Sequence, residues 1–337
     1  MLRRLLAQAP GVCDRRLVVG PGIGLDAAAI DLGDRYLVAK TDPITFLGEE
    51  AGAYVLTVNA NDLATMGATP RWLLATLLLP AGRTTAAQVS RLFAQVRSAC
   101  RTLKVALCGG HSEITDAVTR PVVVGCLLGE CPKDRLVTTA GARVGDAVLL
   151  TKGIPIEAVS ILARVRADEL RRRYSAGFVA RCRRYLDDPG ISVLPEARIA
   201  LAAGGVHAMH DPTEGGLSAA LYELAEAAGV GLRIERSAIR ILPEGARLCA
   251  DYGIDPLGAI ASGALLICAD PRREAAIRRR LDRAGISAAR IGTVVSARSG
   301  VQMVTADGRR TPMPRFAADE LARLLAGKGR RARRLFL

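Results

Sequence analysis

Short apolar runs that end at glycine, proline or aspartate alternate with longer segments of helical periodicity along most of the chain. The short runs are typical of buried strands and the longer segments of helices. In the first half this pattern predicts strands at 17–19, 27–30, 35–40, 72–79, 105–107 and 122–128, and helices at 52–67 and 85–100. The second helix is the clearest, because Thr85 and Gln88 have the spacing of a capping box and an apolar stripe follows them.

The second half repeats this mixture. We predict strands at 147–150, 232–235, 264–268 and 291–295, and helices at 156–166, 194–203, 215–228 and 272–284. The turn-forming stretch 142–146 comes just before the first of these strands, and we place a domain boundary after it. The prediction is an N-terminal domain at 1–146, a C-terminal domain at 147–326 and a basic tail at 327–337. A chain of 337 residues, half of them apolar, is long enough for two domains with separate cores.

The net charge of +14 raises the question of a nucleic-acid partner. Against this, the basic residues are spread along the chain, with local runs at 171–173 and 330–334, and aromatic residues for base stacking are scarce. We therefore do not expect a nucleic-acid partner. A positive field suits phosphorylated small substrates at least as well.

Other features argue against a membrane-spanning helix and against a structural zinc site. No run approaches the roughly eighteen apolar residues of a membrane span, and the apolar run after Arg3 and Arg4 is too short for a signal peptide. The eight cysteines include no Cys-x-x-Cys pair, so buried free thiols are favoured over a structural metal site. We expect a cytoplasmic protein without a membrane partner.

The clearest chemical signal is the distribution of asparagine. The chain has only two, Asn59 and Asn61, and both lie close to Asp62 in the helix predicted at 52–67. Asn59 and Asp62 are three residues apart and therefore share a face of that helix. Mg²⁺ is a hard cation that prefers oxygen ligands, which a carboxylate and an amide supply. We favour a binding site over the alternative, a solvated polar stripe.

Two further windows combine polar residues with turn signals. Gly22 and Gly24 precede Asp26 in a stretch whose backbone N–H groups can bind a phosphate, although a plain turn explains the stretch equally well. Thr41 and Asp42 follow a predicted strand. A carboxylate there either faces a site or forms a turn before proline, and the sequence leaves both readings open.

A fourth window follows the strand predicted at 105–107. Gly109 and Gly110 permit a ligand to approach the backbone closely, and His111 and Glu113 share a side if the chain stays extended. The alternative is a flexible turn with an exposed histidine and glutamate.

In the second half, a fifth window comes just before the helix at 215–228. Asp211 or Thr213 can cap this helix, and free N–H groups at its start can hold a phosphate. The alternative is a well-capped helix without a ligand. Gly215 and Gly216 argue for the ligand, because glycine weakens a first turn that stability alone would fill with alanine.

In this order and spacing, the five windows resemble the AIR synthase-like superfamily, which includes aminoimidazole-ribonucleotide (AIR) synthase, thiamine-monophosphate kinase, selenophosphate synthetase and HypE. The stretch ending at Asp26 is similar to an early Gly-Asp-Asp-Ala-Ala segment of the family. Residues 61–63 and 67–70 are similar to its Asn-Asp-Leu…Gly-Ala-x-Pro segment, and 109–110, 144–146 and 211–216 match further landmarks. The segment 211–216 followed by 254–257 most resembles the HypE branch.

The resemblance implies an α/β plus α+β fold with two domains, in which the mixed sheet of the N-terminal domain joins that of a second copy in a homodimeric barrel. The implied cofactors are ATP and Mg²⁺, with Asp26, Asp42 and Asp62 as metal ligands. These three belong to a larger set of implied cofactor-binding residues, the others being Gly22, Gly24, Thr41, Asn59, Asn61, Gly109, Gly110, His111, Glu113, Asp211, Thr213, Gly215 and Gly216.

By the same resemblance, the expected activity is the ATP-dependent activation of an oxygen on a small-molecule or protein acceptor. A kinase similar to thiamine-monophosphate kinase and a non-catalytic nucleotide-binding partner in metallocentre maturation remain as alternatives. The chain departs from the family at Leu25, where relatives often have a second acidic residue, and at His111, where Asp or Glu is usual. It also ends at Leu337 rather than at the terminal cysteine of HypE, so we expect a different acceptor.

Overall fold

The computed structural model describes residues 12–45 and 50–326, and these divide into two units. Asp14–Gly20 and Asp26–Leu136 form the N-terminal unit, whereas Pro21–Leu25 and the chain from Val137 onward belong to the C-terminal unit. The boundary expected after residue 146 lies shortly beyond this division. The assignment of Pro21–Leu25 to the C-terminal unit was not expected from the sequence.

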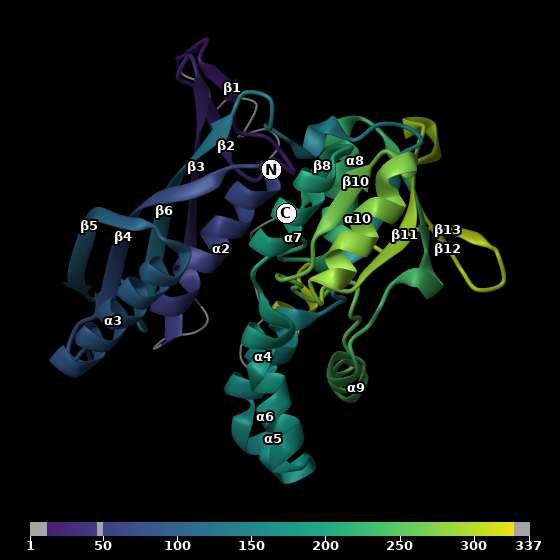
Figure 1. The fold of residues 1–337 in the computed structure, drawn as a ribbon. Coiled ribbons are helices and arrows are strands. Elements are labelled where there is room, and N and C mark those ends of the chain that lie inside the picture. The colour runs from purple at the N-terminus through teal and green to yellow at the C-terminus, as the bar shows by residue number, and fades with distance from the viewer. Residues whose placement is uncertain (1–11, 46–49, 327–337) are drawn as a thin grey trace. The chain divides into compact units, whose positions relative to one another are not determined.

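A mixed sheet forms the centre of the N-terminal unit (Figure 1). Its strands lie in the order β1 (Leu17–Val19), β2 (Ala28–Asp31), β3 (Arg35–Ile44), β6 (Val122–Pro132), β4 (Thr69–Pro80) and β5 (Ala106–Thr115). β4 and β5 are parallel, and the other neighbouring pairs are antiparallel.

Two helices, α2 (Ala51–Thr65) and α3 (Ala86–Leu103), pack on this sheet and on each other. The predicted capping box of α3 is confirmed: Gln88 N donates to Thr85 Oγ1 at 3.2 Å, and Thr85 N donates to Gln88 Oε1 at 2.9 Å. Along β4, buried Leu73 and Ala75 alternate with the more exposed Trp72 and Leu74. Because side chains alternate across a strand, one face of the sheet is covered within this unit and the other carries exposed apolar groups.

The C-terminal unit is built on a second sheet. Its strands lie in the order β13 (Arg310–Pro312), β12 (Val301–Val304), β9 (Gly231–Glu235), β11 (Ala288–Val295), β7 (Ala147–Thr151), β10 (Leu266–Ala269) and β8 (Val206–His210). Only β9 and β12 pair in parallel among these described strands. Every residue of β7 is buried, which agrees with its central place in the sheet.

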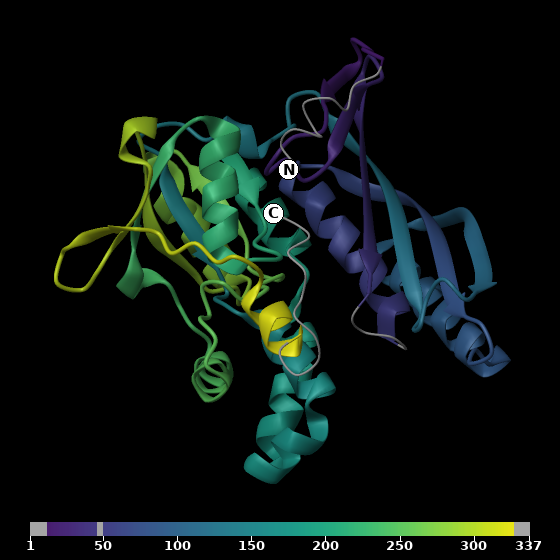
Figure 2. The same cartoon turned by 180° about the vertical axis from the view of Figure 1, so that it is seen from behind.

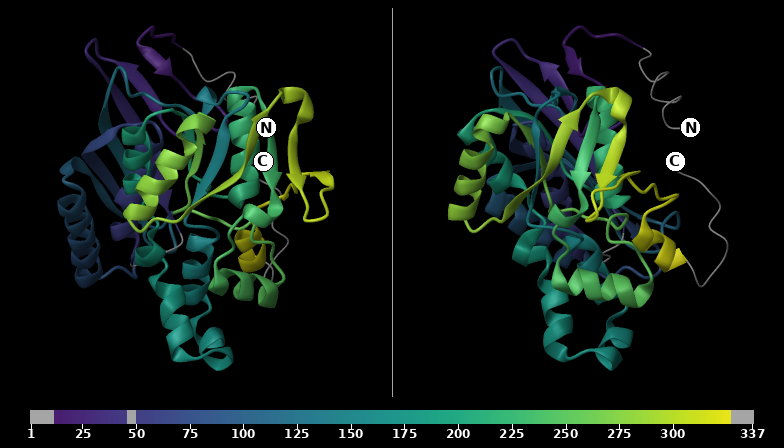
Figure 3. Two further views of the ribbon diagram at one scale, coloured as in Figure 1. Left: turned by 45° about the vertical axis from the view of Figure 1, so that its right-hand side comes forward. Right: turned by 90° about the vertical axis from the view of Figure 1, so that its right-hand side faces the viewer.

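Helices cover both faces of this second sheet (Figures 1 and 2). α7 (Leu194–Ala203) and α10 (Pro271–Arg283) pack together on one face, and α8 (Gly216–Ala228) packs on the other against β9 and β12. A further group of helices packs beside the sheet (Figure 3), and it consists of α4 (Ile156–Val165), α5 (Ala167–Arg173), α6 (Ala176–Arg184) and α9 (Pro243–Tyr252). α11 (Glu320–Ala326) ends the described chain. Among the described residues, no helix has the length and apolar character of a membrane span.

Candidate functional site

A cluster of acidic side chains lies where α2 packs on β3. Asp62 is 5% exposed and comes from α2, while Asp42 and Lys40 come from β3. Lys40 Nζ lies 3.2 Å from Asp62 Oδ2 and 3.3 Å from Asp42 Oδ2. The alternation of the strand explains the arrangement, since Lys40 and Asp42 are two residues apart and point to the face that α2 covers.

The electrostatics of this cluster are dominated by Lys40. Burial disfavours its charged form, but the carboxylates of Asp62 and Asp42, and more weakly that of Asp26, outweigh burial and raise the pKa of Lys40 above its ordinary value. The ammonium group therefore stays charged and holds the two nearest carboxylates close together. The sequence reasoning did not single out Lys40, although its place two residues before Asp42 on a strand was available as a signal.

The two asparagines are buried as the sequence suggested. Asn59 and Asn61 are 0% and 1% exposed, and Asn59 Nδ2 donates to Val55 O at 2.7 Å. No donor among the described residues reaches Asn59 Oδ1. A Cβ on Gly125 of β6 would lie 2.7 Å from Asn59 Nδ2, so a glycine is needed where this amide meets the sheet. The solvated polar stripe is thereby excluded for these residues.

The Gly109–Gly110 segment differs from its prediction. β5 continues to Thr115, so these glycines lie inside an edge strand and not in a loop after it. Gly110 pairs with Ala75 of β4, and its missing Cβ would lie 1.8 Å from Ala75 O. Close backbone packing at this irregular point in the β4–β5 pairing therefore accounts for this glycine.

The register places Gly110 in one row with Asp42 across the sheet. Asp42 pairs with Gly125, Gly125 with Ala75, and Ala75 with Gly110. Three strand spacings separate the two ends of this row, or about 14 Å. Within one chain, the glycine segment therefore does not join the acidic cluster.

Three other expected site residues point to the opposite face of the same sheet. Thr41 lies between Lys40 and Asp42 on β3, and His111 and Glu113 pair with residues of β4 that face away from α2. His111 Nε2 lies 3.8 Å from Glu113 Oε2, which agrees with their expected common side. Strand alternation thus separates Thr41, His111 and Glu113 from the acidic cluster.

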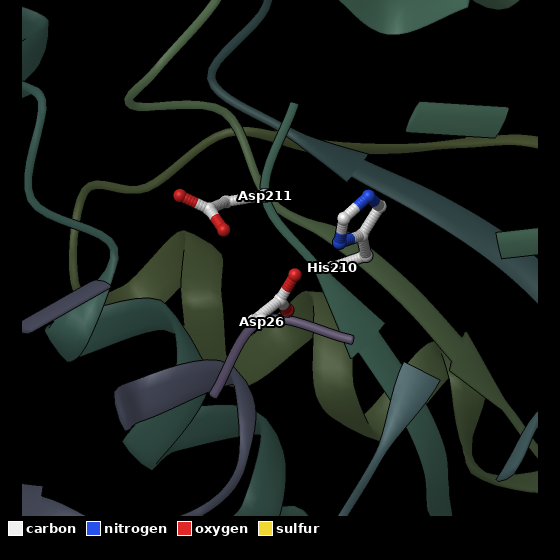
Figure 4. Close-up of side chains that lie close together, drawn as sticks. All are labelled: Asp26, His210 and Asp211. Carbon is white, nitrogen blue, oxygen red and sulfur yellow. The ribbon is translucent and has the colours of Figure 1, made fainter. Parts of the chain in front are cut away.

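The glycine-rich segment before Asp26 has a packing role. Gly24 has a φ of +70°, and a Cβ there would lie 2.7 Å from the backbone oxygen of Glu223 in α8. Only glycine combines this conformation with so close an approach. At Gly22 a Cβ would lie 2.6 Å from the end of the Leu25 side chain, which would have to move. Asp26 follows directly on this segment (Figure 4).

The fifth window lies between β8 and α8. His210 and Asp211 are 4% and 3% exposed at the end of β8 (Figure 4), and His210 Nε2 lies 3.0 Å from Glu223 Oε2. The expectation that Asp211 or Thr213 caps α8 is wrong, because the N-cap is Gly215 and no side chain caps it.

Backbone contacts also account for the glycines at the start of α8. Gly215 N donates to Asp319 Oδ2 at 2.9 Å, and Gly216 N donates to Thr213 O at 3.0 Å. A Cβ on Gly216 would lie 2.6 Å from Ala259 O. These two N–H groups are thus used within the protein, and they are not available to a phosphate in this structure.

An acidic group that the sequence did not reveal lies in the same unit. Glu157 is buried in the first turn of α4, and burial is the main reason that its pKa is raised to about 7. The negative charges of Glu214, Asp319 and Asp211 raise the pKa further, whereas a hydrogen bond from Ser262 lowers it. Asp319 has a raised pKa as well, chiefly because of burial. Tertiary packing brings these carboxyl groups together, so no local sequence motif marks either position.

The pKa of Glu157 predicts a pH dependence of stability. From about pH 4.5 to about pH 7 the unfolded chain ionises this carboxyl while the folded chain keeps it protonated, so the free energy of unfolding falls as pH rises. We expect Glu157→Gln to raise that free energy by roughly 2 kcal/mol more at about pH 8 than at about pH 5. Urea unfolding at the two pH values measures this difference. Glu235 is exposed, so Glu235→Gln is the control. If both variants change the free energy of unfolding by the same amount between the two pH values, the prediction is contradicted.

Comparisons with known proteins place the chain among relatives with this architecture. A family model described as "AIR synthase related protein, N-terminal domain" matches residues 24–131, and the corresponding C-terminal domain model matches 143–304. The carbamoyl dehydratase HypE of Cupriavidus necator is 29% identical over 307 residues, which are 88% of this chain and 84% of that protein.

Solved structures with the same fold include HypE in complex with ATP, with a TM-score of 0.72, 23% identity and coverage of 95% of this chain and 91% of the other. They also include a HypE–HypF complex, with a TM-score of 0.72, 19% identity and coverage of 86% of this chain and 93% of the other. The predicted two-domain AIR synthase-like fold is confirmed by these matches.

Proposed function

The chain belongs to the AIR synthase related proteins, and on this basis we propose that its N-terminal unit binds ATP with Mg²⁺ and activates an oxygen of an acceptor by phosphoryl transfer. The observation that carries the proposal is the burial of Asp62 against β3, beside Asp42 and Lys40. Burying the Asp62 carboxylate beside the Lys40 ammonium, with the partly buried Asp42 as a neighbour, costs desolvation energy, which structural packing alone does not require. The solved complex of HypE with ATP supports the nucleotide as ligand.

The residues of this cluster fit Mg²⁺. We propose Asp26, Asp42 and Asp62 as its ligands, because carboxylate oxygens are the donors that this hard cation prefers. Asn59 Oδ1, which meets no donor among the described residues, can accept a hydrogen bond from a water held by the cation. When bound, Mg²⁺ neutralises phosphate charge, while Lys40 keeps the carboxylates of Asp42 and Asp62 together.

We further propose that the N-terminal unit forms the homodimer. β5 is an edge strand with most of its residues exposed, and an exposed edge pairs readily with another strand. The sheet face away from α2 carries Trp72 and Leu74, which are 37% and 38% exposed. The expected roles of Thr41, Gly109, His111 and Glu113 in binding then depend on this second copy, since they face away from the cluster of their own chain.

The acceptor is proposed to be a carbonyl-type oxygen on a small molecule or a protein. A protein partner is supported by the solved HypE–HypF complex, in which a protein of this fold assembles with another. Phosphorylation turns such an oxygen into a leaving group, and the enzyme's part is positioning and charge stabilisation.

Calorimetry with ATP and phosphate release in the presence of acceptors test this proposal. We expect saturable ATP binding with Mg²⁺ that weakens by about tenfold or more when EDTA removes the cation. Release of phosphate that depends on a carbamoylated thiol peptide would support the activation of an oxygen. Transfer of phosphate to thiamine monophosphate would support a kinase instead, and Mg²⁺-dependent binding without turnover would support a nucleotide-binding partner. Absence of ATP binding would contradict all three.

A further inference from the structure

A cavity lies in the C-terminal unit, and none of the residues assigned to the proposed nucleotide site lines it. It has a volume of about 610 Å³, within the usual range for small-molecule sites. Lys152, at the end of β7, and Glu196, in the first turn of α7, lie in its wall. Arg184 of α6 and Arg240, before α9, lie at its exposed rim. We call it the Lys152 cavity.

Lys152 is held in place by all three donors of its ammonium group. Nζ donates to Gly190 O at 3.0 Å and to Ser192 O at 2.8 Å, and it lies 2.5 Å from Glu196 Oε1. The residue also has a φ of +54°, a left-handed conformation that is unfavourable for a lysine. Such strain persists where the surroundings impose it, and it occurs often at binding sites.

Glu196 has one oxygen without a partner. The residue is 1% exposed, Oε1 pairs with Lys152, and no donor among the described residues reaches Oε2. An unsatisfied buried carboxylate oxygen is costly, so such an atom normally meets a donor. Because Glu196 belongs to the cavity wall, the missing donor would come from what the cavity contains.

Charges of both signs surround the entrance. Arg184 and Arg240 line it together with Asp187 and Asp188, and none of the four forms an ion pair with a described residue. Arg240 Nη1 donates to Ser287 Oγ at 2.7 Å, which fixes its side chain at the rim. A simple anion would meet the two aspartates and Glu196, whereas a metal ion would meet the ammonium of Lys152. A ligand that carries one positive and one negative group matches the lining better than a simple anion or a metal ion does.

We propose that the Lys152 cavity binds a small zwitterion of the α-amino acid class, whose ammonium group donates to Glu196 and whose carboxylate is bound by Arg184 and Arg240. Burial lowers the pKa of Lys152, although Glu196 opposes that change. The cavity shares no residue with the proposed nucleotide site, and the proposal does not depend on ATP binding.

Calorimetry of the full-length chain against the individual α-amino acids, each at up to about 10 mM, tests this proposal. At least one is expected to bind with 1:1 stoichiometry. Glu196→Gln keeps the acceptor for Lys152 but turns an NH₂ group toward the ligand, so affinity should fall about tenfold or more. Arg184→Ala should weaken binding about fivefold. Arg183→Ala is the matched control, since this exposed arginine of the same helix does not line the cavity, and its affinity should stay within about twofold.

Three results would overturn the proposal. The first is that no amino acid binds, in which case a water satisfies Glu196 Oε2. The second is that acetate or inorganic phosphate binds as tightly as any amino acid, which would show a simple anion site. The third is that Glu196→Gln and Arg184→Ala leave affinity unchanged. Arg184 lies at the exposed rim, so its variant keeps the test decisive if Glu196→Gln fails to fold. ATP binding should be the same in all three variants.

Discussion

Asp62→Asn is expected to weaken the binding of ATP with Mg²⁺ by about thirtyfold or more, which is roughly 2 kcal/mol. The substitution keeps the size of a side chain that is 5% exposed, but it removes the charge of one proposed metal ligand. It also leaves Lys40 with only Asp42 as a close carboxylate partner, so the ammonium then repels the cation more strongly. Calorimetry at fixed excess Mg²⁺ measures the change in affinity.

Two controls separate this effect from general damage. Asp134→Asn removes an exposed carboxylate from the same unit and should leave affinity within about twofold. The thermal midpoint of Asp62→Asn without nucleotide should stay close to that of the wild type, because the amide remains a hydrogen-bonding group. If Asp62→Asn binds the nucleotide as the wild type does, α2 does not carry the site and the proposed function loses its main support.

The sequence predicted best those features that are set by local chemistry. The capping box at Thr85 and Gln88 fixed the start of α3, because both of its hydrogen bonds join residues within one turn. The two asparagines marked α2 as a helix that carries polar groups, and both side chains are buried in the structure. Periodicity also placed the central strand β7 close to its observed bounds.

Strand ends and strand faces were harder to predict. β5 continues through Gly109 and Gly110, although two glycines normally signal a turn, because its pairing with β4 overrides local preference. The windows were also treated as parts of one site. Side-chain alternation and the distance across the sheet instead put Thr41, His111 and Glu113 on another face, and Gly110 far from Asp42.

The glycines at the start of α8 show that contacts between residues distant in sequence were also hard to predict. Gly215 and Gly216 were taken as a sign of a phosphate site, whereas packing against Ala259 and the bond to Asp319 account for them. Both partners are distant in sequence, and no single-chain pattern reveals them. The same holds for the ion pair of Lys152 and Glu196, which joins the end of a strand to a helix 44 residues later.

A glutamate in place of Leu74 is expected to convert a dimer into a monomer. Leu74 is 38% exposed on the face of the N-terminal sheet that α2 does not cover, so a charge there costs the isolated chain little. In the proposed dimer the same charge would be buried without a partner, which costs several kcal/mol and corresponds to a weakening of association by about a thousandfold. Light scattering at about 10 µM should give twice the chain mass of 35.6 kDa for the wild type and the single mass for Leu74→Glu.

Val144→Glu is the matched control for this test. Val144 is 65% exposed and belongs to the C-terminal unit, so a glutamate there adds the same charge outside the proposed interface and should leave the dimer intact. The nucleotide affinity of the Leu74→Glu monomer then gives a second result. If Gly109, His111 and Glu113 of the partner complete the site, affinity falls with dissociation. If affinity stays within about twofold, each chain holds a complete site, and these residues have only a structural role in the sheet. A wild-type chain that is already monomeric at this concentration would contradict the proposed dimer directly.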